Sequence, residues 1–218
     1  MKKILTALIA ILVIATACGP LPPSTTPIAN TKVLYSDDFK KPDSGWDRFQ
    51  DYAGVTDYAN VGYLIYIKAP NMIKWTNPTP AKAFPGDVHI EVDATVSFGP
   101  TNNAFGVICR YQDPNNFYYF YISSDGYAGI GKKQNNVHSI ISSPDGKLIK
   151  VDGINTGDAS NHLRVDCIGS NLTLYVNGTQ VATTKDSAFS AGNVGLIART
   201  YDTGGADILF NNFFVYKP

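Results

Sequence analysis

The chain has 218 residues, and its 18 Lys and Arg balance its 18 Asp and Glu, so its formal net charge is zero. This balance provides no long-range field to steer the protein onto nucleic acid or an anionic membrane surface, which argues against both as direct partners. The 13 Tyr, 11 Phe and 19 Gly favour strands and tight turns over helices.

Residues 1–18 have the pattern of an export signal. Two lysines precede an apolar run from residue 4 to residue 15, and Ala-Thr-Ala-Cys18 completes the segment. The apolar run is too short to cross a bilayer of about 30 Å as a helix. The segment resembles a bacterial lipoprotein signal, in which a small residue precedes a cysteine whose thiol carries lipid, although Ala15 stands where such signals usually have Leu. Ordinary secretion also fits, and both routes leave Cys18 as the first mature residue.

These features predict three parts: a signal peptide at 1–17, a lipid-anchored Pro/Ser/Thr-rich tether at 18–31, and one domain at 32–218. The tether has little to bury and would be extended, at up to about 3.1 Å per residue, although a disordered leader with no role is compatible with the same residues. We therefore expect an exported lipoprotein, held at the extracytoplasmic or cell surface through its lipid anchor only.

The domain begins with period-two segments that alternate with turn residues, as in an all-β sandwich. In 88–98 one face would carry Val88, Ile90, Val92, Ala94, Val96 and Phe98, and the other His89, Glu91, Asp93, Thr95 and Ser97. A strand that is buried on one face and hydrated on the other implies an antiparallel sheet. Further strands are expected at 33–39, 62–68, 105–111, 117–123, 128–132, 137–142, 163–168, 172–176, 194–199 and 208–216.

Turn residues separate these segments, among them 113–116, 124–126, 144–146 and 169–171. Asn177-Gly178 supplies the positive φ angles of a two-residue hairpin turn between 172–176 and 180–184. The last strand can lie beside the first and close the domain.

Several motifs follow one another in a familiar order. They are Gly106-Val107-Ile108-Cys109-Arg110-Tyr111-Gln112-Asp113, Asn116-Phe117-Tyr118-Tyr119, Leu163-Arg164-Val165-Asp166-Cys167, Leu172-Thr173-Leu174-Tyr175-Val176-Asn177-Gly178-Thr179, Phe189-Ser190-Ala191-Gly192-Asn193-Val194-Gly195-Leu196 and Ile208-Leu209-Phe210-Asn211-Asn212-Phe213. Residues 33–217 thereby resemble the concanavalin A-like lectin and glucanase superfamily, in its laminin-G-like, family 16 glycoside-hydrolase-like and 3-keto-disaccharide hydrolase-like branches. The resemblance implies an all-β fold, an antiparallel jelly-roll β-sandwich of two packed sheets. It does not choose a function, because the superfamily holds lectins, adhesive modules and hydrolases.

Two cysteines of the domain are expected to point into the core, because each alternates in step with apolar residues of its strand. Cys109 is in phase with Val107, and Cys167 is in phase with Val165. In an exported protein two inward cysteines predict a disulfide, the alternative being two buried thiols that act as small hydrophobes.

The best candidate for hydrolytic chemistry is Glu91-Val92-Asp93, two carboxylates on one strand face. Family 16 hydrolases carry Glu-x-Asp-x-x-Glu or Glu-x-Asp-x-Glu, and here the last position is Val96 or Thr95. Retaining hydrolysis requires a second carboxylate, so no catalytic residue is assigned and a hydrated strand face is the simpler interpretation.

No metal or other cofactor is assigned either. His89, His138 and His162 are far apart in the sequence and have no metal-like spacing. The clusters 113–116 and 102–103 could ligate Ca²⁺, but turn formation explains them equally well.

The alternation of side chains between the two faces of the expected strand 117–122 predicts a binding surface. If Tyr118, Phe120 and Ile122 face the core, then Phe117, Tyr119 and Tyr121 face outward. Arg110, opposite in phase to Cys109, would also point out. An aromatic row beside Arg110 and the carboxylates of Glu91 and Asp93 would suit a sugar, whose C–H faces stack on rings while its hydroxyls need polar partners. Alternatively, loops such as 72–84 cover this face and the rings are simply packing.

The sequence therefore predicts a surface-tethered, non-catalytic module that binds a glycan or another surface polymer. Two alternatives stay open: a glycoside hydrolase of the same fold, and a unit for protein–protein adhesion or assembly.

Overall fold

The computed structural model describes residues 31–79 and 84–218. Within these two ranges all regular secondary structure is β-strand. The predicted signal, Cys18 and the tether up to residue 30 lie outside the described residues. No segment of the described ranges is a helix long and apolar enough to cross a membrane.

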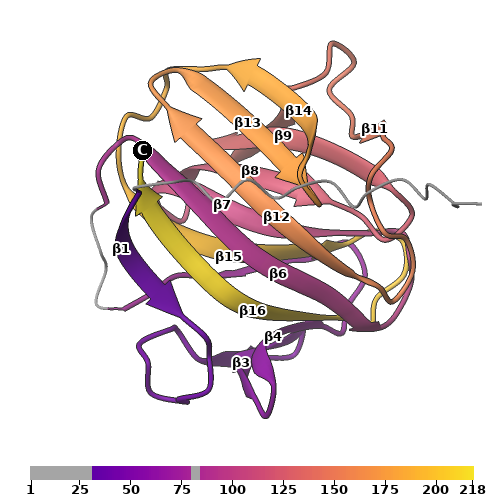
Figure 1. Cartoon of the computed structure of the whole chain (residues 1–218). Helices are drawn as coiled ribbons and strands as arrows, with labels where there is room; N and C mark the ends of the chain where they lie inside the picture. Colours follow the sequence, from indigo (N-terminus) through magenta and orange to yellow (C-terminus); the bar gives the residue numbers. More distant parts are fainter. Residues whose placement is uncertain (1–30, 80–83) are drawn as a thin grey trace, which may run out of the picture.

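The strands form two antiparallel sheets packed face to face, the predicted jelly-roll β-sandwich (Figure 1). The nine-stranded sheet, in front in Figure 1, has the order β14-β13-β12-β6-β16-β4-β3-β2, with β1 also paired to β16. Its strands are β1 (Lys32–Asp37), β2 (Phe49–Asp51), β3 (Gly54–Ala59), β4 (Gly62–Ile67), β6 (Val88–Phe98), β12 (Ser160–Ile168), β13 (Asn171–Val176), β14 (Thr179–Lys185) and β16 (Ala206–Lys217).

The seven-stranded sheet lies behind it and has the order β10-β9-β8-β7-β15-β5, with β11 also paired to β9. Its strands are β5 (Ile73–Thr76), β7 (Asn103–Asp113), β8 (Asn116–Ile122), β9 (Tyr127–Gln134), β10 (Val137–Ile140), β11 (Ile149–Lys150) and β15 (Asn193–Thr200).

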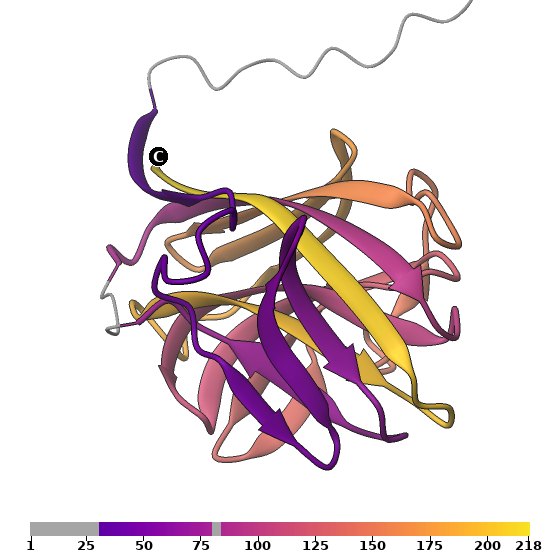
Figure 2. The ribbon, with the colours of Figure 1, turned by 90° about the horizontal axis from the view of Figure 1, so that it is seen from below.

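The first and last strands close the domain, as the sequence predicts. β1 pairs with β16 from Lys32 opposite Lys217 to Asp37 opposite Phe213. In Figure 2 the indigo β1 lies beside the C-terminal end of the yellow β16. The predicted hairpin turn is also present, since Asn177 and Gly178 both have positive φ between the paired strands β13 and β14.

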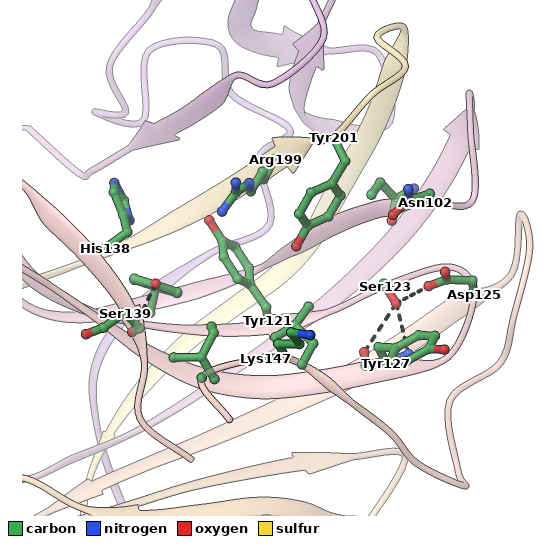
Figure 3. Close-up of a pocket in the computed structure, with 15 residues that line it drawn as sticks. Asn102, Tyr121, Ser123, Asp125, Tyr127, His138, Ser139, Lys147, Arg199 and Tyr201 are labelled. Atoms are coloured by element: carbon green, nitrogen blue, oxygen red, sulfur yellow. Dashed lines mark hydrogen bonds between the residues drawn. The ribbon is translucent and has the colours of Figure 1, made fainter. Parts of the chain in front are cut away.

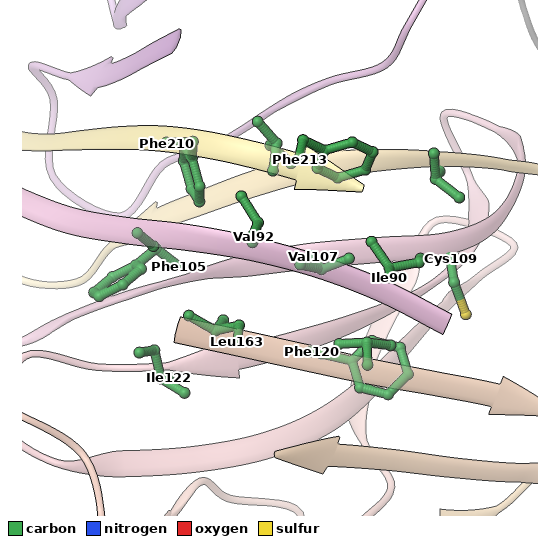
Figure 4. Packing of buried hydrophobic residues seen from close by; sticks show 14 of the residues in the cluster. Ile90, Val92, Phe105, Val107, Cys109, Phe120, Ile122, Leu163, Phe210 and Phe213 are labelled. Carbon is green, nitrogen blue, oxygen red and sulfur yellow. The ribbon is translucent and has the colours of Figure 1, made fainter. Parts of the chain in front are cut away.

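The core lies between the sheets and is built by strand alternation. Val88 and each second residue up to Val96 are buried, and they pack with residues such as Phe105, Phe120 and Phe210 (Figure 4). Phe98, predicted to share this face, is instead 70% exposed. The pairing with β16 shifts by one residue between Asp207 and Ile208, opposite the end of β6, and the alternation is lost there.

A disulfide joins Cys109 of β7 to Cys167 of β12, so the predicted pairing is confirmed. Both cysteines are fully buried in the core. Because β7 and β12 belong to different sheets, the bond ties the two layers of the sandwich together.

Candidate functional site

The outer face of the seven-stranded sheet carries a second apolar cluster, separate from the sandwich core. Its buried members are Ala104, Ile108, Phe117, Tyr119, Tyr121 and Ile197. On β8 this cluster alternates with Tyr118, Phe120 and Ile122, which face the core, so the strand has the predicted parity. The rings are not openly exposed, however, because Tyr119 and Tyr121 keep only 2% and 1% of their surface.

A pocket of about 570 Å³ opens above these tyrosines (Figure 3). Its lining comes from β7, β8, β9, β10 and β15 and from loops next to these strands: Asn102, Asn103, Tyr119, Tyr121, Ser123, Asp125, Tyr127, His138, Ser139, Ile140, Gly146, Lys147, Leu148, Arg199 and Tyr201. Both predicted tyrosines thus lie in a concave site made from segments that are far apart in the sequence.

Tyr119 and Tyr121 form the floor, with ring centroids 4.8 Å apart. Tyr119 lies over Gly131 of β9, where a Cβ atom would overlap its ring. At Gly129 a Cβ would approach the side chain of Leu148 to 2.7 Å, so this glycine makes room for the loop that walls the pocket. The two glycines therefore allow side chains to lie flat on the sheet.

The β9–β10 hairpin supplies one wall. Its turn residues Asn135 and Asn136 both have positive φ, the conformation of a tight two-residue hairpin turn. The pairing sets His138 opposite Lys133. The hydroxyl of Tyr119 donates to the backbone carbonyl of Ser139 at 3.2 Å, which fixes the floor to this wall.

The opposite wall comes from the end of β15. The guanidinium of Arg199 stacks over the ring of Tyr201, with 4.6 Å from Cζ to the ring centroid. Figure 3 shows the Arg199 guanidinium and the Tyr121 hydroxyl pointing into the same space, with His138 and Tyr201 on either side.

Polar atoms without partners concentrate in this pocket. Four buried side-chain polar atoms of the described residues have no hydrogen-bond partner, and three of them are the Tyr121 hydroxyl, Nδ1 of His138 and Nε of Arg199. The fourth is the hydroxyl of Thr56, on β3. Leaving a buried polar group unpaired costs about 1–3 kcal/mol. All three atoms belong to side chains that line one pocket, so a polar ligand that enters it can satisfy them after small side-chain adjustments.

Burial sets the protonation of the groups in the pocket. It raises the pKa of Tyr121 well above 10, so its hydroxyl stays protonated and can donate. It also lowers the pKa of His138 to about 4, with the charges of Lys133 and Arg199 adding to the effect. His138 is therefore neutral at physiological pH.

The outer rim of the pocket is more polar. The hydroxyl of Ser123 donates to the carboxylate of Asp125, and the backbone N–H of Tyr127 donates to Ser123 Oγ at 2.9 Å. Lys150 lies over the ring of Tyr127, 5.1 Å from its centroid.

Phe117, the third predicted aromatic, does not line the pocket. It is fully buried and packs against Trp75 and Tyr111, with ring centroids 5.7 and 5.5 Å away. For this residue the packing interpretation holds, and Trp75 belongs to the segment 72–84 that was expected to cover the face.

The predicted position of Arg110 beside the tyrosines is wrong. Arg110 has φ of 52° where the pairing of β7 with β8 is irregular, and it is only 3% exposed. Its guanidinium donates to the carbonyls of Gly86 and Phe189 at 2.9 and 3.0 Å. The local bulge breaks the alternation on which the prediction depended, and Arg110 instead pins two loops together.

The predicted proximity of Glu91 and Asp93 to the aromatic row is also wrong. Both lie on β6, in the nine-stranded sheet, whereas the pocket is on the outer face of the other sheet. Asp93 accepts hydrogen bonds from Asn212 at 2.8 Å and pairs with His162 at 2.8 Å. The hydrogen bond from His162 lowers the pKa of Asp93, which therefore serves a polar network on a hydrated strand face.

The possible calcium ligands are used in turns. Asp113 accepts from the backbone N–H of Asn115 at 2.7 Å, and Asn103 accepts from that of Ser124 at 3.1 Å. Among the described residues, no three His, Cys, Asp or Glu side chains form a group that could hold a metal ion.

No family model matches this chain, and no curated protein matches it. Among solved structures, the carbohydrate-binding module CBM66 of Bacillus subtilis aligns with a TM-score of 0.62 and 20% identity, over 80% of this chain and 96% of that one. A β-glucanase of Bacillus licheniformis aligns with a TM-score of 0.59 and 10% identity, over 84% and 97%. The CBM2 module of the evolved Dit of Lactobacillus casei BL23 phage J-1 aligns with a TM-score of 0.56 and 12% identity, over 85% and 95%. At these identities the likeness shows a shared fold.

Proposed function

We propose that this protein is a carbohydrate-binding module and that the pocket above Tyr119 and Tyr121 holds the saccharide. The observation that carries the proposal is that Tyr121, His138 and Arg199, which line one pocket, each have a buried polar atom without a hydrogen-bond partner. A sugar offers hydroxyl groups that can pair with all three.

The shape and composition of the pocket also suit a sugar. Its volume of about 570 Å³ lies in the range of small-molecule sites. Tyr127, which is exposed, and Tyr201, which is half-buried, line the pocket and provide apolar ring surface for the C–H face of a pyranose or furanose ring. The surrounding polar groups can fix the orientation of the sugar. The similarity in fold to CBM66 and to the CBM2 module supports the same function.

We propose that the module binds without hydrolysis. Glycoside hydrolysis needs two carboxyl groups that flank the scissile bond. Among the described residues that line the pocket, Asp125 is the one carboxylate. The fold likeness to a β-glucanase keeps the hydrolase alternative testable, and the release of reducing ends from a bound glycan would favour it.

We further propose that the module is exported and anchored through lipid on Cys18. The sequence pattern of residues 1–18 supports this location, and so does the Cys109–Cys167 disulfide, because disulfides persist mainly in oxidising compartments.

The sharpest test of the site exploits the unpaired hydroxyl of Tyr121. Tyr121→Phe keeps the ring and removes the hydroxyl, so we expect saccharide affinity to fall about fivefold, the value of one neutral hydrogen bond, while the free energy of unfolding rises. Thr56→Val is the matched control, because it also removes an unpaired buried hydroxyl but lies outside the pocket.

The measurements are a glycan-array screen of residues 31–218, calorimetric titration of each hit, and urea unfolding of both variants. Thr56→Val should raise stability and leave affinity unchanged. Equal affinities of the wild type and Tyr121→Phe for every hit would remove the saccharide from this pocket. If the array is blank and a protein partner instead loses binding with Tyr121→Phe, the adhesion alternative replaces the proposal.

A further inference from the structure

The charges of the pocket are unbalanced. Arg199 and Lys147 line it, against the one carboxylate of Asp125. Lys133 lies on the same face, only 6% exposed, with its ammonium over the rings of Trp75 and Phe117 at 5.0 and 5.9 Å. Among the residues that the structure describes, neither Arg199 nor Lys133 forms an ion pair.

No other part of the chain can supply the missing anion. Residues 1–30 and 80–83 contain neither Asp nor Glu. A buried or half-buried cation is costly unless it is paired, which is why such groups normally have a carboxylate partner. Arg110 shows the usual solution in this protein, since two backbone carbonyls and Asp87 satisfy its guanidinium.

Two of the three unpaired atoms favour an anion over a neutral hydroxyl. Nε of Arg199 and the hydroxyl of Tyr121 are donors, and stacking on Tyr201 holds the guanidinium in place. A planar guanidinium matches a carboxylate, which can accept two parallel N–H bonds. The Asp125 carboxylate lies beside Ser123, from which it accepts a hydrogen bond, and away from Arg199 (Figure 3). It therefore does not neutralise the Arg199 guanidinium.

We propose that the pocket selects an acidic saccharide, with a carboxylate of the sugar paired to the Arg199 guanidinium and hydrogen-bonded to the Tyr121 hydroxyl. This inference rests on the proposed saccharide-binding function and names the class of sugar. The accessible rings of Tyr127 and Tyr201 contact the ring of the sugar, and Arg199 selects its charge.

The test compares saccharides of the same ring configuration that carry or lack a negative charge. Oligogalacturonate and oligomannuronate are titrated against their methyl esters, which keep the sugar rings and remove the negative charge, and neutral galacto- and manno-oligosaccharides complete the set. We expect binding of an acid form and a loss of roughly tenfold to hundredfold for its ester, as for a charged hydrogen-bonded pair.

Two variants locate the charge. Arg199→Gln should abolish the preference for the acid over its ester, and Arg199→Lys should restore only part of it, because an ammonium cannot form the planar fork. Arg48→Gln is the control, since Arg48 pairs with Asp57 outside the pocket. The Arg199 Nε–H resonance should shift on addition of the acid form and stay in place with the ester.

The outcomes separate the two proposals. If neutral saccharides bind as well as acidic ones and Arg199→Gln affects both equally, the acidic class is wrong while saccharide binding stands. If no saccharide in the set or on the array binds, both proposals fail. A sulfated sugar that binds through Arg199 while every carboxylated sugar is rejected would also overturn the carboxylate assignment.

Discussion

The ring of Tyr119 on β8 lies flat over Gly131, its cross-strand partner on β9. The side chain of a tyrosine normally stands away from its sheet, and it can lie down here only because the facing position has no Cβ. This one pair gives the outer face of the seven-stranded sheet a shallow aromatic floor, with room for the pocket above it.

We therefore predict that Gly131→Ala displaces the Tyr119 ring and disturbs the floor. Overpacking of this kind typically costs about 1–3 kcal/mol in the free energy of unfolding, and saccharide affinity should fall with it. Urea unfolding and calorimetric titration measure the two effects.

The double variant Gly131→Ala with Tyr119→Leu provides the control. With the ring gone, the added methyl group should cost much less stability than it does beside Tyr119. Equal costs in the two backgrounds would show that the ring and the glycine do not oppose each other.

The second prediction concerns the bond between the sheets. The cysteines are separated by 58 residues, and for a loop of this length the chain-entropy model gives about 4 kcal/mol of stabilisation. Cys109→Ala with Cys167→Ala should lower the free energy of unfolding by about this amount. Addition of a reductant should lower that of the wild type and leave the double variant unchanged; a wild type insensitive to reductant during unfolding would contradict the prediction.

Strand alternation explains how far the sequence could predict this fold. Periodicity fixes which face a residue occupies, so the buried side of β6, the two faces of β8 and the inward direction of Cys109 and Cys167 follow from parity. The polar segment at β2 and β3 and the short β5 carry too little periodicity to reveal strands, and their pairing depends on the rest of the sheet.

Strand parity predicts the wrong direction for a side chain where the strand pairing is irregular. It also cannot tell which of the two sheets a strand belongs to. Arg110 follows Cys109 by one residue, yet its positive φ turns it away from the face that counting assigns. Glu91 and Asp93 point outward as predicted but belong to the other sheet. Sequence periodicity carries no information on which strands are neighbours.

The residues that sequence reasoning missed have the same explanation. Arg199 alternates with inward Leu196 and Ala198 of the predicted strand 194–199, so parity could have placed it outward. Its approach to Tyr121 depends on β15 and β8 flanking β7. His138 lies in the pocket because the β9–β10 hairpin places it there. The Asn135-Asn136 pair could have predicted the turn of this hairpin from the sequence.

The third prediction concerns the N-terminus. The mature protein should begin at Cys18 with lipid on its thiol, because the export signal predicted from the sequence ends there. Cys18→Ser should release the protein from membranes, as measured by fractionation. An unmodified mature N-terminus in mass spectrometry of the wild type would refute lipidation and leave ordinary secretion.

The last prediction is that the pKa values of two histidines are shifted in opposite directions. The pKa of His138 is lowered to about 4 by burial and by the nearby Lys133 and Arg199. The pKa of His162 is raised above 6.5, chiefly by its hydrogen bond with Asp93. NMR titration of the ring protons should resolve both shifts.

These shifts make stability depend on pH with opposite signs. Between pH 6.5 and 4 the unfolded chain binds a proton at position 138 that the folded protein does not, so the unfolding free energy falls as the pH is lowered through this window. The stabilisation from His162 is present in full below pH 6.5 and is lost as the pH rises through its folded pKa. His138→Gln should therefore flatten the acid side of the stability curve, and His162→Gln the neutral side. If urea unfolding between pH 4.5 and 8 gives the same slope for both variants as for the wild type, the two environments are not as assigned.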